Sequence, residues 1–140
     1  MKLTLEKASI IVDKTLEKGR ELKIRPLCVA VLDEGGHLKA LKREDEASIL
    51  RPQIAIGKAW GAVGMGESTR ELGQRLKDRP TFLNSLSDLS DGKVVPVAWG
   101  VLILEGNSII GAVGVSGGTS DEDEACAIEG LRAAGLEFKA

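Results

Sequence analysis

Residues 109–128 read IIGAVGVSGGTSDEDEACAI, and this stretch says most about the fold. Its first part is an apolar run typical of a buried strand, which Ser116-Gly117-Gly118 interrupts. Thr119 or Ser120 is expected to cap the following helix. Residues 121–124 are all acidic, which suits the first turn of a helix, where the helix dipole is positive. The stretch therefore predicts a strand, a tight turn and a helix.

Further strands are predicted on the N-terminal side of this stretch. Residues 101–104 form one, joined to it by a hairpin turn at residues 105–107, and residues 94–97 form another. Residues 27–33 and 37–43 predict a second hairpin around Glu34-Gly35-Gly36. Because hairpin connections dominate, the five strands predict a mostly antiparallel sheet flanked by α-helices, an α+β fold.

Three helices and one short helical piece within a loop are expected before the last helix. Thr4 is a candidate cap for a first helix that Gly19 ends. A second helix is expected from Ser48 to about Val63, with Pro52 in its first turn. Residues 68–71 fit the capping box of a short third helix. Residues 79–92 predict a loop with a short helical piece.

Composition excludes several classes of protein. The 140 residues fit a single domain over residues 1–140, and 43% hydrophobic with 29% charged residues is ordinary for a globular chain. A net charge of −2 without a basic patch argues against nucleic acid as a partner. Neither a membrane-spanning stretch nor a signal peptide is evident, so no membrane partner and a cytoplasmic location are expected.

Metal chemistry by several protein ligands is not expected. The chain has one histidine, too few for a multi-histidine site. Cys28 and Cys126 lack metal-type spacing and are interpreted as buried free thiols. Trp60 and Trp99 are more typical of a core or an interface than of a stacking platform.

The strand glycines allow two interpretations. Gly111 and Gly114 could make room for a helix packed on the strand, because glycine inside a strand marks a close approach of another group. Alternatively, together with Gly117 and Gly118, they line a pocket for an anionic ligand. The acidic residues 121–124 argue against phosphate, and the missing βαβ context argues against a dinucleotide fingerprint.

A few polar side chains are candidates for binding or catalysis. His37, just after the glycine turn, is the only imidazole that could reach a haem iron, although a lone histidine on a hairpin is more often a surface residue. Arg43 and Lys58 could face one cleft, where two cations would suit the carboxylates of a small acid or a haem. Asp45 and Lys58 are the candidate acid–base groups if the chain is an enzyme.

Several motifs, in their order along the chain, resemble the GlcG/HbpS-like family of haem-binding proteins, whose domain also forms the C-terminal part of PduO-type proteins. They are Asp33-Glu34-Gly35-Gly36-His37-Leu38, Arg43-Glu44-Asp45, Lys58-Ala59, Thr69-Arg70-Glu71-Leu72 and the run from Gly111 to Gly118 followed by Asp123. The resemblance covers nearly the whole chain. It implies a profilin-like fold, assembly into a dimer, tetramer or octamer, and haem as a cofactor in some members.

Three hypotheses for function follow. The first is a small-molecule-binding protein, with haem or a related tetrapyrrole as ligand, held by His37, Arg43, Lys58, Gly117 and Gly118. The second is an enzyme, an isomerase, lyase or hydrolase, acting on a small organic acid in a catabolic pathway. The third is an accessory oligomeric subunit without a ligand.

Overall fold

The computed structural model describes residues 2–95 and 100–140. Its helices are α1 (Leu5–Glu21), α2 (Arg51–Met65), α3 (Thr69–Arg75), α4 (Pro80–Leu89) and α5 (Ser120–Ala133). Its strands are β1 (Cys28–Asp33), β2 (Leu38–Arg43), β3 (Gly100–Glu105), β4 (Ser108–Ser116) and β5 (Glu137–Lys139). Strand, turn and helix follow one another over residues 108–133, as the opening stretch predicts.

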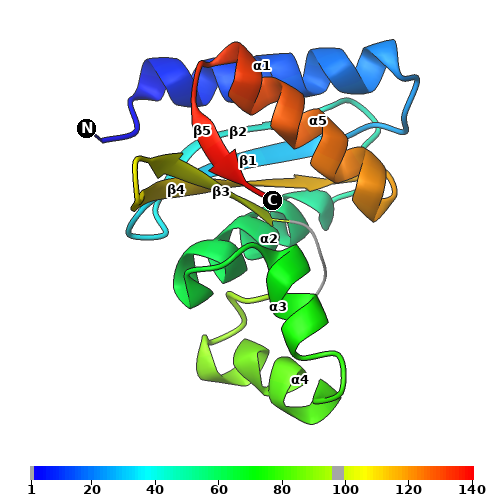
Figure 1. Ribbon diagram of the computed structural model, residues 1–140. Coiled ribbons are helices and arrows are strands. Elements are labelled where there is room, and N and C mark those ends of the chain that lie inside the picture. Colours follow the sequence, from blue (N-terminus) through cyan, green and yellow to red (C-terminus); the bar gives the residue numbers. More distant parts are fainter. Residues whose placement is uncertain (1, 96–99) are drawn as a thin grey trace.

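The strands form one sheet in the order β2-β1-β4-β3-β5, and every neighbouring pair is antiparallel. Helices α1 and α5 cover one face, and α2 covers the other, with α3 and α4 beyond α2 (Figure 1). The predicted α+β fold, an antiparallel five-stranded sheet flanked by helices, is therefore confirmed.

Alternate side chains of β1 point to opposite faces, which is the period of a strand. Val29 and Val31 join the core beneath α1 and α5, whereas Ala30 and Leu32 face α2. Both faces are covered, so the strand is apolar along nearly its whole length. The sheet can therefore present polar groups only at its strand ends and its edges.

The glycines bring the backbone of α2 directly onto the sheet. A Cβ at Gly114 would overlap the carbonyl oxygen of Ala55, and one at Gly100 would overlap that of Lys58. The structural interpretation of the strand glycines, room for a packed helix, is thus confirmed at Gly114. No pocket can open between α2 and this part of the sheet.

The prediction of a strand at residues 94–97 is wrong for residues 94 and 95, which are the part of it that the structure describes. Val94 donates its N–H to Ser90 Oγ and accepts a hydrogen bond from Ser87 Oγ at its carbonyl. The serines ending α4 thus occupy the groups that a neighbouring strand would need. Residues 96–99, including Trp99, lie outside the described residues. The fifth strand is instead β5, whose three residues are too few to show a period.

Some helix boundaries also differ from expectation. Helix α1 continues past Gly19 to Glu21. Glycine at position 19 makes room for Leu27, which packs where a side chain would lie, and does not end the helix. Helix α2 begins at Arg51 rather than Ser48, with Pro52 in its first turn. The loop expected over residues 79–92 contains the ten-residue α4. The predicted side-chain caps of α1, α3 and α5 are all confirmed.

Candidate functional site

The predicted site residues divide between two ends of the sheet. Cys28 pairs with Arg43 on one side and with Ser116 on the other, so these residues share one end of β1. His37 precedes β2 and lies at the opposite end, beside Asp33. A six-residue strand is about 20 Å long, so His37 and Arg43 do not share a pocket within one chain. We call these the turn end (with Ser116) and the hairpin end (with His37).

At the hairpin end, Asp33 organises the turn that carries His37. Its Oδ1 accepts the backbone N–H groups of Gly35 and His37 and lies 3.3 Å from His37 Nδ1. Burial alone would raise the pKa of the Asp33 carboxyl, but these hydrogen bonds and the imidazole hold it below its ordinary value. The His37 side chain is 82% exposed. Since Asp33 engages Nδ1, Nε2 is the nitrogen left for a metal.

An aromatic ring lies under the turn that carries this imidazole, and a lysine lies against that ring. The half-buried Trp60 packs under the turn, so closely that a Cβ at Gly36 would touch its indole nitrogen. Lys93 Nζ lies 5.6 Å from the centre of the Trp60 ring, and Leu38 is about half exposed next to His37. The hairpin end thus combines an exposed imidazole, an aromatic surface and a lysine.

At the turn end, Lys58 and Asp123 form a buried ion pair. Lys58 Nζ lies 3.0 Å from Asp123 Oδ2 and donates to the carbonyl of Val115 at 2.8 Å. Asp123 Oδ1 accepts the backbone N–H of Gly118 at 2.9 Å. Burial raises the pKa of the Asp123 carboxyl, and the neighbouring charge of Lys58 opposes that rise. The pair joins α2, β4 and α5, and the Lys58 side chain is buried among them. Its role in ligand binding stays a prediction.

A cleft of about 360 Å³ opens beside this turn, and Gly117 and Gly118 line it. Its other walls are the segment before β1, with Lys23 and Arg25, and the first residue of α2, Arg51. Arg51 Nη1 donates to Ser116 Oγ at 3.0 Å. Sequence reasoning did not select Arg51. Its spacing of seven residues from Lys58, two helical turns, was the signal that could have identified it.

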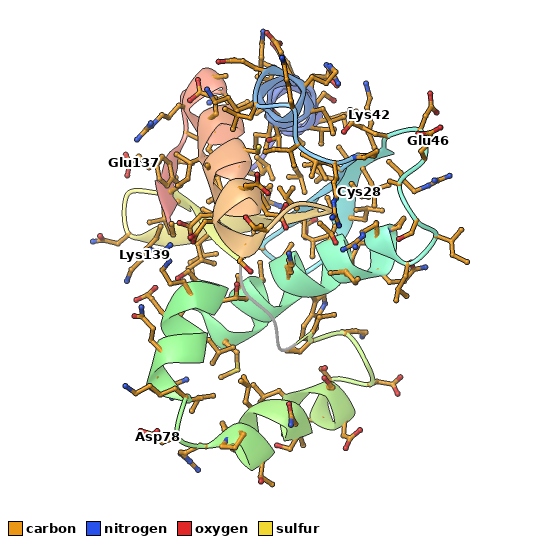
Figure 2. All side chains as sticks on the ribbon, turned by 90° about the vertical axis from the view of Figure 1, so that its right-hand side faces the viewer. Cys28, Lys42, Glu46, Asp78, Glu137 and Lys139 are labelled. Atoms are coloured by element: carbon orange, nitrogen blue, oxygen red, sulfur yellow. The ribbon has the colours of Figure 1, made fainter. Side chains whose placement is uncertain are left out.

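Arg43 and Asp45 line a separate cleft of about 550 Å³, together with Leu16 and Arg20. Arg43 Nη1 donates to the carbonyl of Ala47 at 2.6 Å, so its guanidinium already holds the loop after β2. Lys42 lies at the outer edge on this side of the molecule (Figure 2). Asp45 and Lys58, the two candidate acid–base groups, do not meet. Their catalytic role stays a prediction.

The cysteines are buried free thiols, as predicted. Burial raises the pKa of both the Cys28 and the Cys126 thiol to about 11, which disfavours the thiolate that binds metals. Within residues 2–95 and 100–140, no group of three or more potential ligands could hold a metal ion. None of the described helices is both long and apolar enough to cross a membrane.

The profile of the family described as "Haem degrading protein HbpS-like" matches residues 3–132. The chain belongs to the HbpS-like family. It is 28% identical over 86% of its length to a 15.0 kDa protein from the dhaT-dhaS intergenic region of Citrobacter freundii, covering 84% of that protein. It is also 30% identical over 77% of its length to the corrinoid adenosyltransferase PduO of Salmonella typhimurium. The HbpS-like chain spans only 32% of that PduO.

Solved structures of the HbpS-like fold superpose closely on this chain. A PduOC:heme complex matches it over 100% of both chains, with a TM-score of 0.87 and 26% sequence identity. HbpS matches 94% of this chain and 89% of its own, with a TM-score of 0.82 and 29% identity. A Klebsiella pneumoniae protein, ORFY, has a TM-score of 0.85 and 28% identity over 95% of this chain and 90% of its own.

Proposed function

We propose that this chain binds haem or a related tetrapyrrole at its hairpin end, with His37 Nε2 as the axial ligand. The observation that carries the proposal is the exposed His37 imidazole with Nδ1 against Asp33. A carboxylate on one ring nitrogen fixes the ring and makes the other nitrogen a better metal ligand. Membership of the HbpS-like family and the likeness to a PduOC:heme complex support the same ligand.

The surroundings of His37 fit a tetrapyrrole. Trp60 and Leu38 offer apolar surface for the macrocycle, and Lys93 offers a cation for a propionate. When bound, the haem would supply an iron centre for ligand binding or electron transfer. Arg43 and Lys58, predicted to meet its carboxylates, lie toward the other end of the sheet. The proposed site therefore uses Lys93 in their place.

Titration of the protein with hemin tests this site. Wild type should give a saturable shift of the Soret band, and His37→Ala should lose it because no other imidazole exists in the chain. Free imidazole added to His37→Ala should restore the shift, because it can reach the iron in place of the exposed side chain that was removed. Lys39→Ala, on the same exposed hairpin, is the matched control and should bind as wild type does. An unchanged saturable shift in His37→Ala would refute the axial role.

A homo-oligomer is also part of the proposal. Ile49 and Leu50, just before α2, are 89% and 60% exposed, and large apolar side chains at such exposure are typical of subunit contacts. Light scattering at micromolar concentration should therefore give a mass above that of one chain, and Ile49→Ser together with Leu50→Ser should lower it. A monomeric wild type would contradict the proposal.

A further inference from the structure

We infer that the cleft at the turn end binds a small dicarboxylate through Arg51, Arg25 and Lys23. This site lies at the opposite end of the sheet from His37 and does not depend on haem binding. Its cationic side chains come from two separate segments, the residues before β1 and the start of α2, and the turn after β4 with the start of α5 closes the cleft.

The charges of the cleft are unbalanced. Lys23, Arg25 and Arg51 form no ion pair with a carboxylate in the part of the chain that the structure describes. The acidic side chain that lines the cleft is Glu122, whose Oε1 accepts the backbone N–H of Thr119 at 2.9 Å. Three cations against one carboxylate leave two positive charges, which a dianion would neutralise.

The other acidic residues at the start of α5 are paired with cations, although the charge of Asp123 also acts on Arg51. Asp123 faces Lys58 in the interior. Glu124 lies 2.9 Å from Arg70, and Asp121 lies 3.7 Å from the same guanidinium. The repulsion expected from the sequence of residues 121–124 is therefore largely directed away from the cleft.

The walls of the cleft are held in place before any ligand arrives. Ser116 Oγ accepts a hydrogen bond from Arg51 and orients its guanidinium, which keeps further N–H donors for a carboxylate. Gly117 has a φ of 138°, and a Cβ there would overlap the carbonyl oxygen of Pro26. The two walls therefore touch, and the buried Lys58–Asp123 pair fixes the turn from beneath.

The ligand class follows from size and chemistry. About 360 Å³ lies near the lower limit for small-molecule sites. Ile24 contributes apolar lining, which suits the carbon skeleton of an organic acid rather than inorganic phosphate. The N–H of Gly118 is already bonded to Asp123, so recognition depends on the side-chain cations and not on the α5 terminus. Two arginines match the planar, two-oxygen geometry of carboxylates.

Isothermal titration with succinate tests the inference, with inorganic phosphate and the uncharged succinamide at equal ionic strength as comparisons. Succinate should bind wild type saturably, and Arg51→Gln and Arg25→Gln should each weaken it roughly tenfold or more. Arg25 is exposed and its side chain makes no hydrogen bond or ion pair within residues 2–95 and 100–140, so Arg25→Gln should fold normally even if Arg51→Gln does not. Lys42→Gln is the matched control, since Lys42 pairs with Asp13 beside the neighbouring cleft.

Three outcomes would overturn the inference. The first is the absence of saturable succinate binding to wild type, and the second is equal affinity of Arg25→Gln and wild type. The third is phosphate binding as tightly as succinate, which would show a general anion site instead of a dicarboxylate site.

Discussion

Lys58 and Asp123 carry opposite charges in a place from which water is nearly absent, with side chains 6% and 2% exposed. Such a pair adds little to the stability of the fold compared with apolar side chains of similar volume, but removing one partner leaves an uncompensated buried charge. Their value at this position is geometric, because Asp123 also holds Gly118 and Lys58 also holds Val115.

Lys58→Met is therefore expected to lower the free energy of unfolding by about 3–5 kcal/mol. The double variant Lys58→Met/Asp123→Asn should lose much less of this free energy. The asparagine amide is uncharged, and its oxygen can still accept the Gly118 N–H. Urea denaturation of wild type, both single variants and the double variant measures the difference. Equal losses in the single Lys58 variant and the double variant would contradict a charge-based explanation.

Glu124 gives a pH dependence of stability. Burial raises the pKa of its carboxyl above the ordinary value of 4.5, the charge of Arg70 opposes that rise, and Asp121 adds to it. Its Oε2 has no hydrogen-bond partner among the residues that the structure describes. The folded chain holds the Glu124 proton more tightly than the unfolded chain. The protonated carboxyl therefore adds to the stability of the fold below pH 4.5, and this gain is lost as the pH rises through the folded-state pKa.

Glu124→Gln, which stays uncharged, should therefore gain stability relative to wild type as the pH rises above 4.5. Urea unfolding of both proteins below and above that pH measures the change. Glu129→Gln, an exposed position on the same helix, is the control and should follow wild type at every pH. A constant difference between Glu124→Gln and wild type would refute the assignment.

At the scale of elements, the contact of α2 with β3 and β4 depends on glycine. Gly114→Ala should lower the free energy of unfolding by about 3 kcal/mol or more, because its Cβ would meet the backbone of Ala55. Gly73→Ala, inside α3 with nothing within 4 Å of the added carbon, should raise it by about 0.5–1 kcal/mol. Thermal unfolding of the two variants compares them directly. Similar effects at both positions would contradict the packing argument.

Elements with a long, regular pattern were predictable from sequence. Strands β1 and β4 were predictable because they are continuous apolar runs between turn residues, and α5 because its cap and acidic first turn are local signals. The segment at Val94 is apolar too, but its strand-like pattern cannot reveal that Ser87 and Ser90 take its backbone groups. The three-residue β5 exists only because β3 offers an edge to pair with.

The candidate site was less predictable than the fold. Sequence patterns grouped Gly117, Gly118 and Lys58 in one pocket. In the structure the two glycines line a cleft, and Lys58 is paired with the buried Asp123. Side-chain direction depends on such long-range partners. Likewise, His37 and Arg43 are far apart because they lie at opposite ends of β2, which only the assembled hairpin makes evident.

At the scale of the whole molecule, the hairpin end and the turn end are separated by the length of the sheet. The two proposed ligands should therefore bind independently, and saturating succinate should leave the hemin dissociation constant unchanged. Thermodynamic linkage requires the reverse titration to agree. A hemin titration with and without succinate measures the coupling. A change of more than about threefold would indicate that the ends meet, for example across a subunit contact.

The backbone contact between α2 and the sheet also bears on how such a chain can change over evolution. Where Gly100 and Gly114 meet the helix, no side chain remains that substitution could enlarge, shrink or recharge. Adaptation to a new ligand must then come from the loops at either end of the strands, while the middle of the molecule stays the same. The central layer thus acts as a fixed scaffold, and each end can diversify without cost to the other.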